Sequence, residues 1–488
     1  EALEDNTTGT LNTAVGSYAG SKNTTGSNNT SVGVNALYNT TTGDSNTAVG
    51  RDALENNTTG AENVAVGAYA LDANTTGSQG VAIGYNALTS QNSDVKNTAV
   101  GYRALQGLTS GDGNVGMGRD VLYSLTTGGG NVAIGNDALG SNTTANDNVA
   151  VGRNALGANT TGTENVAIGA YALDANTTAS YNTAVGHDSM TNTTTGFSNA
   201  ALGQDTLRDN TTGDGNTALG YSALLLNTTA DNNTAVGRVA MESNTTGYNN
   251  TAVGSNALNA NTTGINNAVL GQNALDACTS GSQNTAVGQQ ALSAVTTANG
   301  MTAVGRNALG SMIDGTNCVA VGENAGDAKT TGDSLVAVGR NCLTAVTTGN
   351  NNTAMGTNAG LSVTTGGSNV FIGHYTGMVG PTTGSNNTYV GSNAGYQATG
   401  SNNVCLGQGS NPSANDSSNQ ITLGNTSNDN LRCNDTSISS LSDRRDKTDI
   451  VDLPTGLNFL NTLRPVKFKW ATRDGNIKDG KIRAGFIA

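Results

Sequence analysis

Ser442 and Lys447 are the residues whose types and spacing come nearest to a nucleophile with its base. They lie in the segment Ser-Asp-Arg-Arg-Asp-Lys, in which Asp443 directly follows the serine. A lysine amine accepts a proton at neutral pH only when burial lowers its pKa, so such a pair would become active only in a folded assembly. The alternative interpretation is a hydrophilic linker whose charges are solvated.

The other reactive side chains do not form a recognisable site. The two histidines, His187 and His374, are too far apart in the sequence to share one repeat, and we interpret both as surface residues. Carboxylates such as Asp52, Glu62 and Asp137 are scattered over variable positions, whereas an enzyme that cuts polysaccharide needs two at a set separation. We therefore expect no glycosidase, no metal site and no cofactor.

The cysteines are odd in number and include no C-x-x-C motif. They fall at unrelated places in the repeat described below, and one of them stands where alanine is usual. We therefore predict small core residues rather than a disulfide framework or a metal site. The five are Cys278, Cys318, Cys342, Cys405 and Cys433.

A 17-residue repeat organises most of the chain. Its marker is Asn-Thr-Ala-Val-Gly, which first occurs at residues 12–16, and its glycine returns every 17 residues up to Gly373. Three further copies end at Gly391, Gly407 and Gly424. A fixed period over so much of a chain is typical of stacked-repeat proteins. Positions are numbered below from this glycine, which is position 0.

The residues around the glycine predict a short strand between two turns. Position −1 is Val, Ile, Leu or Met in every copy, position −2 is usually Ala, and position −3 is usually Thr or Val. Positions −3 and −1 therefore share one face, and alanine points the other way. Glycine at position 0 predicts a sharp turn or a close backbone approach. Leucine at +4 adds a second apolar element, and Thr-Thr-Gly at +8 to +10 adds a second turn.

One such unit cannot bury a core alone, so each repeat is expected to form one coil of an all-β solenoid. About 25 coils with strands about 4.8 Å apart would make a rod on the order of 120 Å long. Asn at −4, present in 18 of the 22 in-phase copies, predicts a ladder of side-chain hydrogen bonds between coils. The alanine face of every strand is expected to pack against another chain, which favours a parallel homotrimer.

Composition divides the chain into four segments. We predict a regular shaft over 1–373, irregular coils over 374–424, an extended neck over 425–441, and the first part of a small α+β domain over 442–488. In the last segment, 454–463 is expected to be a helix and 465–470 a strand. Aromatic residues enter near the start of the irregular coils, which predicts either locally wider coils, our preferred interpretation, or a collar that contacts a receptor. These residues are Phe371, Tyr375, Tyr389 and Tyr396.

Charge and hydropathy exclude two classes of partner. The net charge is −13, and the part before Asp443 carries 12 Lys/Arg against 29 Asp/Glu. An acidic rod is a poor nucleic-acid binder. No apolar run approaches the 18 or so residues that a membrane-spanning helix needs, so we expect no membrane insertion. The sequence opens inside a repeat, and we expect further residues before Glu1.

The C-terminal segment resembles the intramolecular chaperone domain of phage tail fibres, tailspikes and endosialidases. The resemblance is carried by Ser-Asp-Arg-Arg-Asp-Lys-Thr-Asp-Ile, by Gly-Leu-Asn-Phe-Leu-Asn-Thr-Leu-Arg-Pro-Val-Lys-Phe-Lys-Trp and by the final Gly-Phe-Ile-Ala. It implies a domain that trimerises the fibre and then cuts itself off at a Ser-Asp bond. The implied cleavage site is Ser442-Asp443, with Ser442 and Lys447 as the catalytic pair. The family's domain continues past Gly-Phe-Ile-Ala.

The repeat itself resembles the β-roll heads of trimeric autotransporter adhesins, whose period is shorter. Both resemblances imply homotrimers. Our leading hypothesis is a phage tail-fibre shaft in a virion that binds a host receptor, either a glycan or a surface protein. The alternatives are a bacterial surface adhesin or extracellular filament of the same build and, because Thr-Thr pairs stack, an ice-binding solenoid. A virion-attachment domain or a signal peptide before Glu1 would distinguish the first two.

Overall fold

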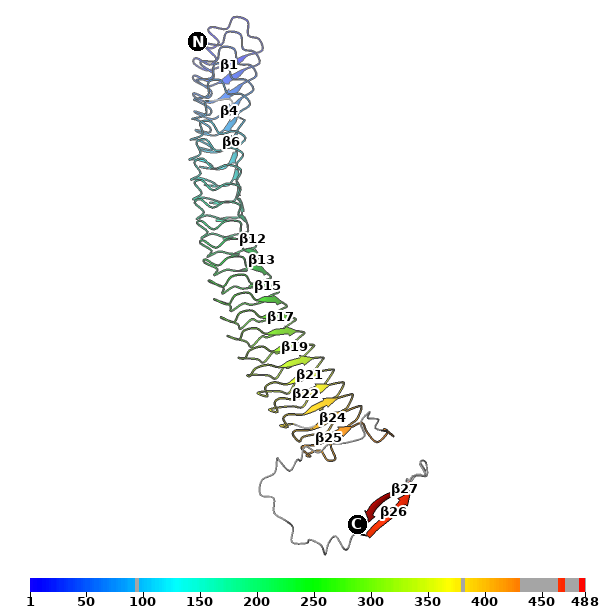
Figure 1. The fold of residues 1–488 in the computed structure, drawn as a ribbon. Coiled ribbons are helices and arrows are strands. Elements are labelled where there is room, and N and C mark those ends of the chain that lie inside the picture. Colours follow the sequence, from blue (N-terminus) through cyan, green and yellow to red (C-terminus); the bar gives the residue numbers. More distant parts are fainter. Residues whose placement is uncertain (93–95, 379–381, 431–463, 470–481, 488) are drawn as a thin grey trace. The chain divides into compact units, whose positions relative to one another are not determined.

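The computed structural model describes residues 1–92, 96–378 and 382–430, together with the backbone of two strands at 464–469 and 482–487. The chain divides into two compact units, Glu1–Ser427 and Asn428–Ala488. The first unit is an elongated stack of coils (Figure 1), and the described residues contain no helix. The predicted all-β solenoid of about 25 coils is thus confirmed.

Each coil contributes one strand of three residues, and the strands form a single 25-stranded sheet. Their bounds are β1 (Thr13–Val15), β2 (Thr30–Val32), β3 (Thr47–Val49), β4 (Val64–Val66), β5 (Val81–Ile83), β6 (Thr98–Val100), β7 (Val115–Met117), β8 (Val132–Ile134), β9 (Val149–Val151), β10 (Val166–Ile168), β11 (Thr183–Val185), β12 (Ala200–Leu202), β13 (Thr217–Leu219), β14 (Thr234–Val236), β15 (Thr251–Val253), β16 (Ala268–Leu270), β17 (Thr285–Val287), β18 (Thr302–Val304), β19 (Val319–Val321), β20 (Val336–Val338), β21 (Thr353–Met355), β22 (Val370–Ile372), β23 (Thr388–Val390), β24 (Val404–Leu406) and β25 (Ile421–Leu423).

Every strand pairs in parallel with the strand of the next coil, and equivalent repeat positions face each other. In the regular shaft Val166 lies beside Thr183, one period away. The longer and shorter spacings near the end are absorbed outside the strands, because Val370 still pairs with Thr388 and Thr388 with Val404. The register therefore keeps each repeat position in one column along the stack.

Alanine at −2 points into the solenoid, not outward. Ala167 and Ala184 are fully buried, as are Ala172 at +3 and Leu173 at +4. Residues at −1 point the other way, and Ile168 remains 40% exposed. The prediction that the alanine face meets another chain is therefore wrong: the coil is so thin that most coils have room only for a small side chain between the strand and the leucine opposite. The face left for a partner carries the larger residues at −3 and −1.

The repeat glycine makes the predicted close approach. Gly186 has φ +143°, and a Cβ added there would lie 2.2 Å from the carbonyl oxygen of Gly203 in the next coil. Both the conformation and the contact exclude an L side chain. The same geometry recurs at the equivalent glycine of almost every coil, which explains why this position does not vary.

Two columns of asparagine run through the stack. At −4, as predicted, the backbone NH of Asn165 donates to Asn148 Oδ1 (3.0 Å), and Asn165 Nδ2 donates to the same oxygen (3.2 Å) and to the carbonyl of Ala179 (2.9 Å). At +7 a second column, which was not predicted, forms a similar ladder: Asn176 Nδ2 donates to Asn159 Oδ1 (2.9 Å). The asparagine side chains thus provide hydrogen-bond partners for backbone groups in the turns, which would otherwise be buried without a partner.

Other residues interrupt the second column in some coils, as Leu108 and Leu125 do, and no asparagine occurs in it after Asn261. It continues through Cys278, Val295 and Met312 and then holds Lys329, which is fully buried. Lys329 Nζ donates to the carbonyl of Gly349 and to Asn350 Oδ1 (3.4 Å). Burial lowers the pKa of this amine, although Cys318 and Asp333 act in the opposite direction.

The aromatic residues of the irregular coils fall into two groups, of which the first replaces core alanine. Phe371 and Tyr389 stand at −2 and are 2% exposed. Glycine accompanies them at +4, and a Cβ on Gly377 would lie 2.8 Å from Phe371 Cε1. The ring therefore occupies the space that leucine fills in other coils, and wider coils are not required. A receptor-contacting collar is excluded for these two side chains.

Candidate functional site

The predicted catalytic residues Ser442, Asp443 and Lys447 lie outside the described residues, and so does the helix predicted at 454–463. The predicted strand at 465–470 is found as β26 (Arg464–Lys469), which pairs antiparallel with β27 (Ile482–Ile487). In this hairpin Val466 faces Gly485. The roles of the Ser442 hydroxyl and the Lys447 amine therefore stay predictions.

The two histidines belong to separate surface clusters. His187 Nδ1 lies 2.9 Å from Asp188 Oδ2, and its ring meets the Tyr171 ring edge-on. The His374 ring lies 3.9 Å from the Tyr375 ring, centroid to centroid. Among the residues with described side chains, no group of His, Cys, Asp and Glu could hold a metal ion.

The cysteines behave as the sequence predicts where they can be followed. Cys278, Cys318, Cys342 and Cys405 are buried and free. Burial raises the pKa of the Cys342 thiol to about 12 and that of Cys278 to about 11. Both thiols are therefore protonated and unreactive at neutral pH. Cys433 lies outside the described residues.

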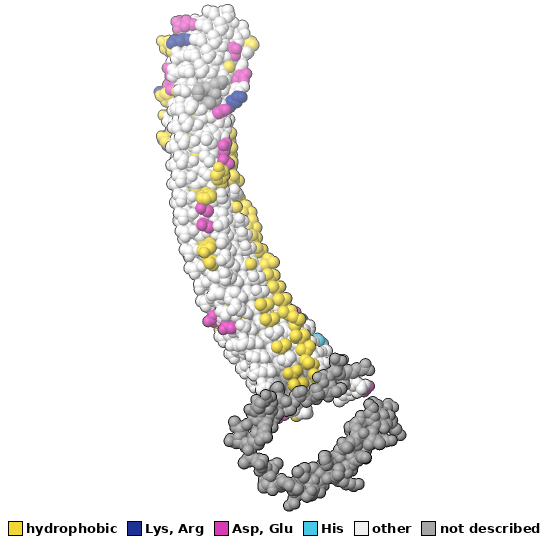
Figure 2. Space-filling view, viewed as in Figure 1, with side chains coloured by type: hydrophobic (Ala, Val, Ile, Leu, Met, Phe, Trp, Pro, Cys, Tyr) yellow, Lys and Arg dark blue, Asp and Glu magenta, His cyan; other side chains and the backbone are white. Residues whose placement is uncertain are grey.

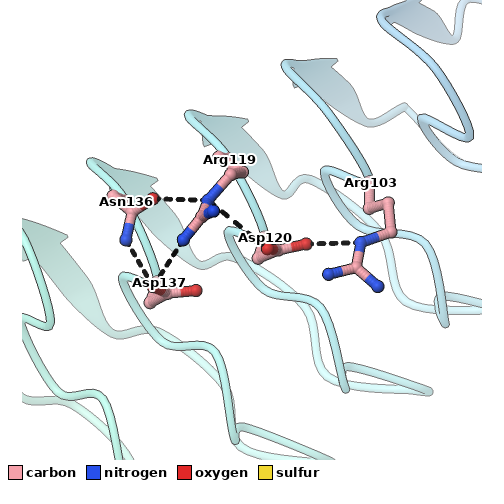
Figure 3. Close-up of polar contacts among 5 residues, drawn as sticks. All are labelled: Arg103, Arg119, Asp120, Asn136 and Asp137. Carbon is pink, nitrogen blue, oxygen red and sulfur yellow. Dashed lines mark hydrogen bonds and ion pairs between the residues drawn. The ribbon is translucent and has the colours of Figure 1, made fainter.

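A row of ion pairs joins successive coils on one edge of the shaft (Figure 3). Arg103 Nε lies 2.6 Å from Asp120 Oδ1, Arg119 Nε donates to Asn136 Oδ1 (2.8 Å), and Arg119 also contacts Asp120 (3.6 Å) and Asp137 (3.7 Å). These residues occupy +1 and +2, directly after the strands. Arg103, Asp120 and Asp137 border a shallow hollow of about 490 Å³, and Gly140 and Gly157 at +5 form part of its wall. Asp120 and Asp137 both form ion pairs with arginine, so we interpret the cluster as a structural link between coils.

A second hollow, of about 580 Å³, lies among the irregular coils. It contains the other two aromatic residues of that region, Tyr375 and Tyr396, both half-buried. The four aromatic residues are close together in the sequence, and their repeat positions distinguish the two groups. Side chains at −2 point inward, whereas those at +2 and +5 point to the surface. That distinction is the signal by which this hollow could have been found.

An uncharged surface strip, called the apolar strip below, is formed by the first and third residues of β1–β25: the third residue is Val, Ile, Leu or Met in every strand, and the first is Thr, Val, Ala or Ile. None of these residues is charged. Most third residues are substantially exposed, including Leu202 (48%), Leu270 (52%) and Met355 (52%). Figure 2 shows apolar side chains gathered in a band along one side of the middle and C-terminal coils of the stack. Long uncharged bands of this kind are typical of surfaces that contact another protein.

The threonine pairs are used differently at their two positions. At +8 the hydroxyl bonds to the next coil, as Thr160 Oγ1 does to the carbonyl of Thr177 (2.9 Å). At +9 the side chain is exposed, as at Thr178. In coils that carry the pair, one of its two hydroxyls is thus engaged between coils, whereas the ice-binding alternative invokes both as exposed groups.

Residues 442–488 match the family model described as the chaperone of endosialidase. Comparison of the chain with curated proteins gives no match. The described residues include no helix that is long and apolar enough to cross a membrane. The chain therefore joins a β-solenoid to a C-terminal segment of the endosialidase-chaperone type.

Proposed function

We propose that this tail-fibre-like chain is the shaft of a phage tail fibre, that three copies assemble in parallel, and that the fibre attaches the virion to its host. The apolar strip carries the proposal. A strip three residues wide and about 25 strands long covers roughly 1,200 Å² per chain, whereas a stable protein interface needs about 800 Å² from each partner. The endosialidase-chaperone segment, whose family is associated with trimerisation, supports three copies rather than two.

The strip also favours a parallel arrangement with aligned coils. Each coil presents the same kind of residue at the same height, so copies in register bring matching apolar rows together along the whole shaft. An offset by one coil would be almost equally favourable for the shaft alone. A C-terminal domain that associates first would set the register, which is a physical reason for coupling this solenoid to a trimerising segment.

Charge substitution in the strip tests the assembly. We expect the full chain to have three times its 48.8 kDa mass by light scattering. Replacing both Ile168 and Leu202 with lysine should reduce the measured mass or cause aggregation, because two charges per chain would be buried at the interface. Lysine at both Thr178 and Thr212, exposed at +9, adds the same charge elsewhere and should leave the trimer intact. A strip variant that assembles as well as the control would refute the interface.

We propose in addition that the chaperone segment is released by self-cleavage between Ser442 and Asp443. The support is the family match, which begins at Ser442, and the presence of a lysine, Lys447, five residues after the serine. Mass spectrometry of the expressed protein tests this. Ser442→Ala and Lys447→Ala should each leave the bond intact in a trimeric protein, and cleavage of the Lys447→Ala variant would contradict the dyad.

The alternative, a bacterial surface adhesin or extracellular filament of the same build, makes the same use of the strip. Electron microscopy of purified virions with antibody raised against the shaft would separate the two. Labelled tail fibres support the first function, and labelled cell surfaces without virions support the second.

A further inference from the structure

The second hollow is formed by equivalent positions of three successive coils. Tyr375, Asn393 and Gly409 all stand at +2, shortly after β22, β23 and β24, and Tyr396 at +5 lines the same hollow. His374 and Asn411 complete its lining. Backbone hydrogen bonds hold the coils in step at this point, since Asn393 N donates to the carbonyl of His374 (2.9 Å) and Gly409 N to that of Ser392 (2.9 Å).

Gly409 is what leaves the hollow open. Its φ is +62°, and a Cβ added there would meet only Asn425 Nδ2, at 3.5 Å. The backbone does not demand glycine, because Asn393 adopts φ 57° at the same position of the preceding coil. Asparagine tolerates this left-handed conformation well. The missing side chain therefore creates space that the fold itself does not need.

The chemistry of the lining selects a ligand class. Two phenols and two amides can each donate and accept hydrogen bonds, as the hydroxyl groups of a sugar do. The rings of Tyr375 and Tyr396 offer apolar surface beside these polar groups, the combination found in small-molecule sites. The hollow is open to solvent, with His374 exposed and both tyrosines half-buried.

We propose that this hollow binds a neutral pyranose unit of a glycan. No lysine or arginine lines it among the described residues, so an acidic sugar would meet no counter-charge and would be repelled by the acidic shaft. The proposal rests on the proposed host-attachment function and names its ligand class and site. It also separates the aromatics by role: Phe371 and Tyr389 fill the core, whereas Tyr375 and Tyr396 contact sugar.

Saturation-transfer NMR on the full chain tests the site. The probes are the methyl glycosides of glucose, galactose, mannose, N-acetylglucosamine and N-acetylgalactosamine, with sialic acid and glucuronic acid as charged comparisons. We expect at least one neutral glycoside, and neither acid, to receive saturation. Silence from every neutral glycoside, or a stronger signal from an acid, overturns the proposal.

Variants then place the binding. Gly409→Asn fills the hollow with the residue found at +2 of the preceding coil, and Tyr396→Ala removes one ring. Each substitution should lower the affinity for the bound glycoside about tenfold or more. Tyr181→Ala removes an exposed tyrosine (58%) outside the hollow and should change nothing. Unchanged binding by Gly409→Asn would show that the sugar sits elsewhere and overturn the assignment.

These outcomes are separable from failure of the proposed function. Light scattering of the same samples reports trimer assembly independently of sugar binding. If the protein is a trimer but binds no neutral glycoside, the sugar-binding proposal is refuted and the fibre proposal stands. If the protein is a monomer that binds a neutral glycoside, the sugar-binding proposal stands and the fibre proposal is refuted.

Discussion

Phe371 and Gly377 offer a sharp test of how the core is filled. Phe371 stands where other coils have alanine, and Gly377 stands where they have leucine. The two changes Phe371→Ala and Gly377→Leu together recreate the ordinary coil. Gly377 has φ +59°, and leucine at the same repeat position has φ near 50°, as in Leu343 (φ 51°), so the backbone accepts the new side chain.

The expected energies have opposite signs in the two backgrounds. Phe371→Ala alone empties a site that is 2% exposed and should cost about 3–5 kcal/mol. Gly377→Leu alone places a Cβ 2.8 Å from the Phe371 ring and should cost about 1–3 kcal/mol or more through overpacking. In the Phe371→Ala background the same leucine fills the cavity and should return about 1–3 kcal/mol. Recovery is partial, because Gly360 on the other side of the ring still lacks a side chain.

Hydrogen exchange is the appropriate measurement, because stability in a stacked-repeat protein is local. Exchange rates of peptides covering 356–391 should rise in each single variant. They should be slower in the double variant than in Phe371→Ala. Peptides from the coils around Gly186 serve as the internal control and should not respond. If Gly377→Leu accelerates exchange equally in both backgrounds, the ring and the leucine do not share one space and the reasoning fails.

Three further outcomes are expected. Gly186→Val should lower the local stability by about 2–5 kcal/mol, because Gly186 has φ +143° and an added Cβ would clash with the carbonyl oxygen of Gly203. Asp188→Asn, the control, should change the stability by less than about 0.5 kcal/mol. Equal thermal stability of the two variants would contradict this. Lys329→Met should stabilise the protein by about 1–3 kcal/mol. Since the folded-state pKa of Lys329 is lowered, wild-type stability should rise with pH towards the ordinary value of 10.5, so the advantage of the methionine in denaturant titrations should shrink between pH 7 and 10. Tyr389→Phe should raise stability by about 1 kcal/mol, since the buried hydroxyl makes no hydrogen bond of good geometry within the described residues, and an equal or lower denaturation midpoint would contradict this.

The solenoid could be predicted from the sequence because its signal is a period rather than a propensity. The −1 residue, the glycine and the asparagine at −4 each recur in one phase, and stacking is the arrangement that makes each of them useful. Buried cysteines such as Cys342 followed from the same alignment of columns. The strand at Arg464–Lys469 also followed from ordinary alternation.

What the period could not reveal was which side of the strand faces inward. Alternation separates Ala167 from Ile168 but does not assign either to the interior, and the larger residue is normally the buried one. The interior of this coil is too narrow for that rule. The split between Phe371 and Tyr375 was missed for the same reason: the two faces must be assigned before an aromatic can be placed in the core or on the surface.

The direction of the hydrogen bonds between coils has a mechanical consequence. The bonds that join one coil to the next, such as Gly186 N to Ile168 O and Ala175 N to Thr191 O, connect successive turns of the stack rather than residues within one turn. Tension along the stack would thus be shared by all the bonds of a junction at once, and no junction could open without breaking its whole set. Stretching such a rod should therefore require high force, with extension released in whole-coil steps. A thin filament whose interior is filled mainly by alanine and leucine can in this way transmit tension without a thick core.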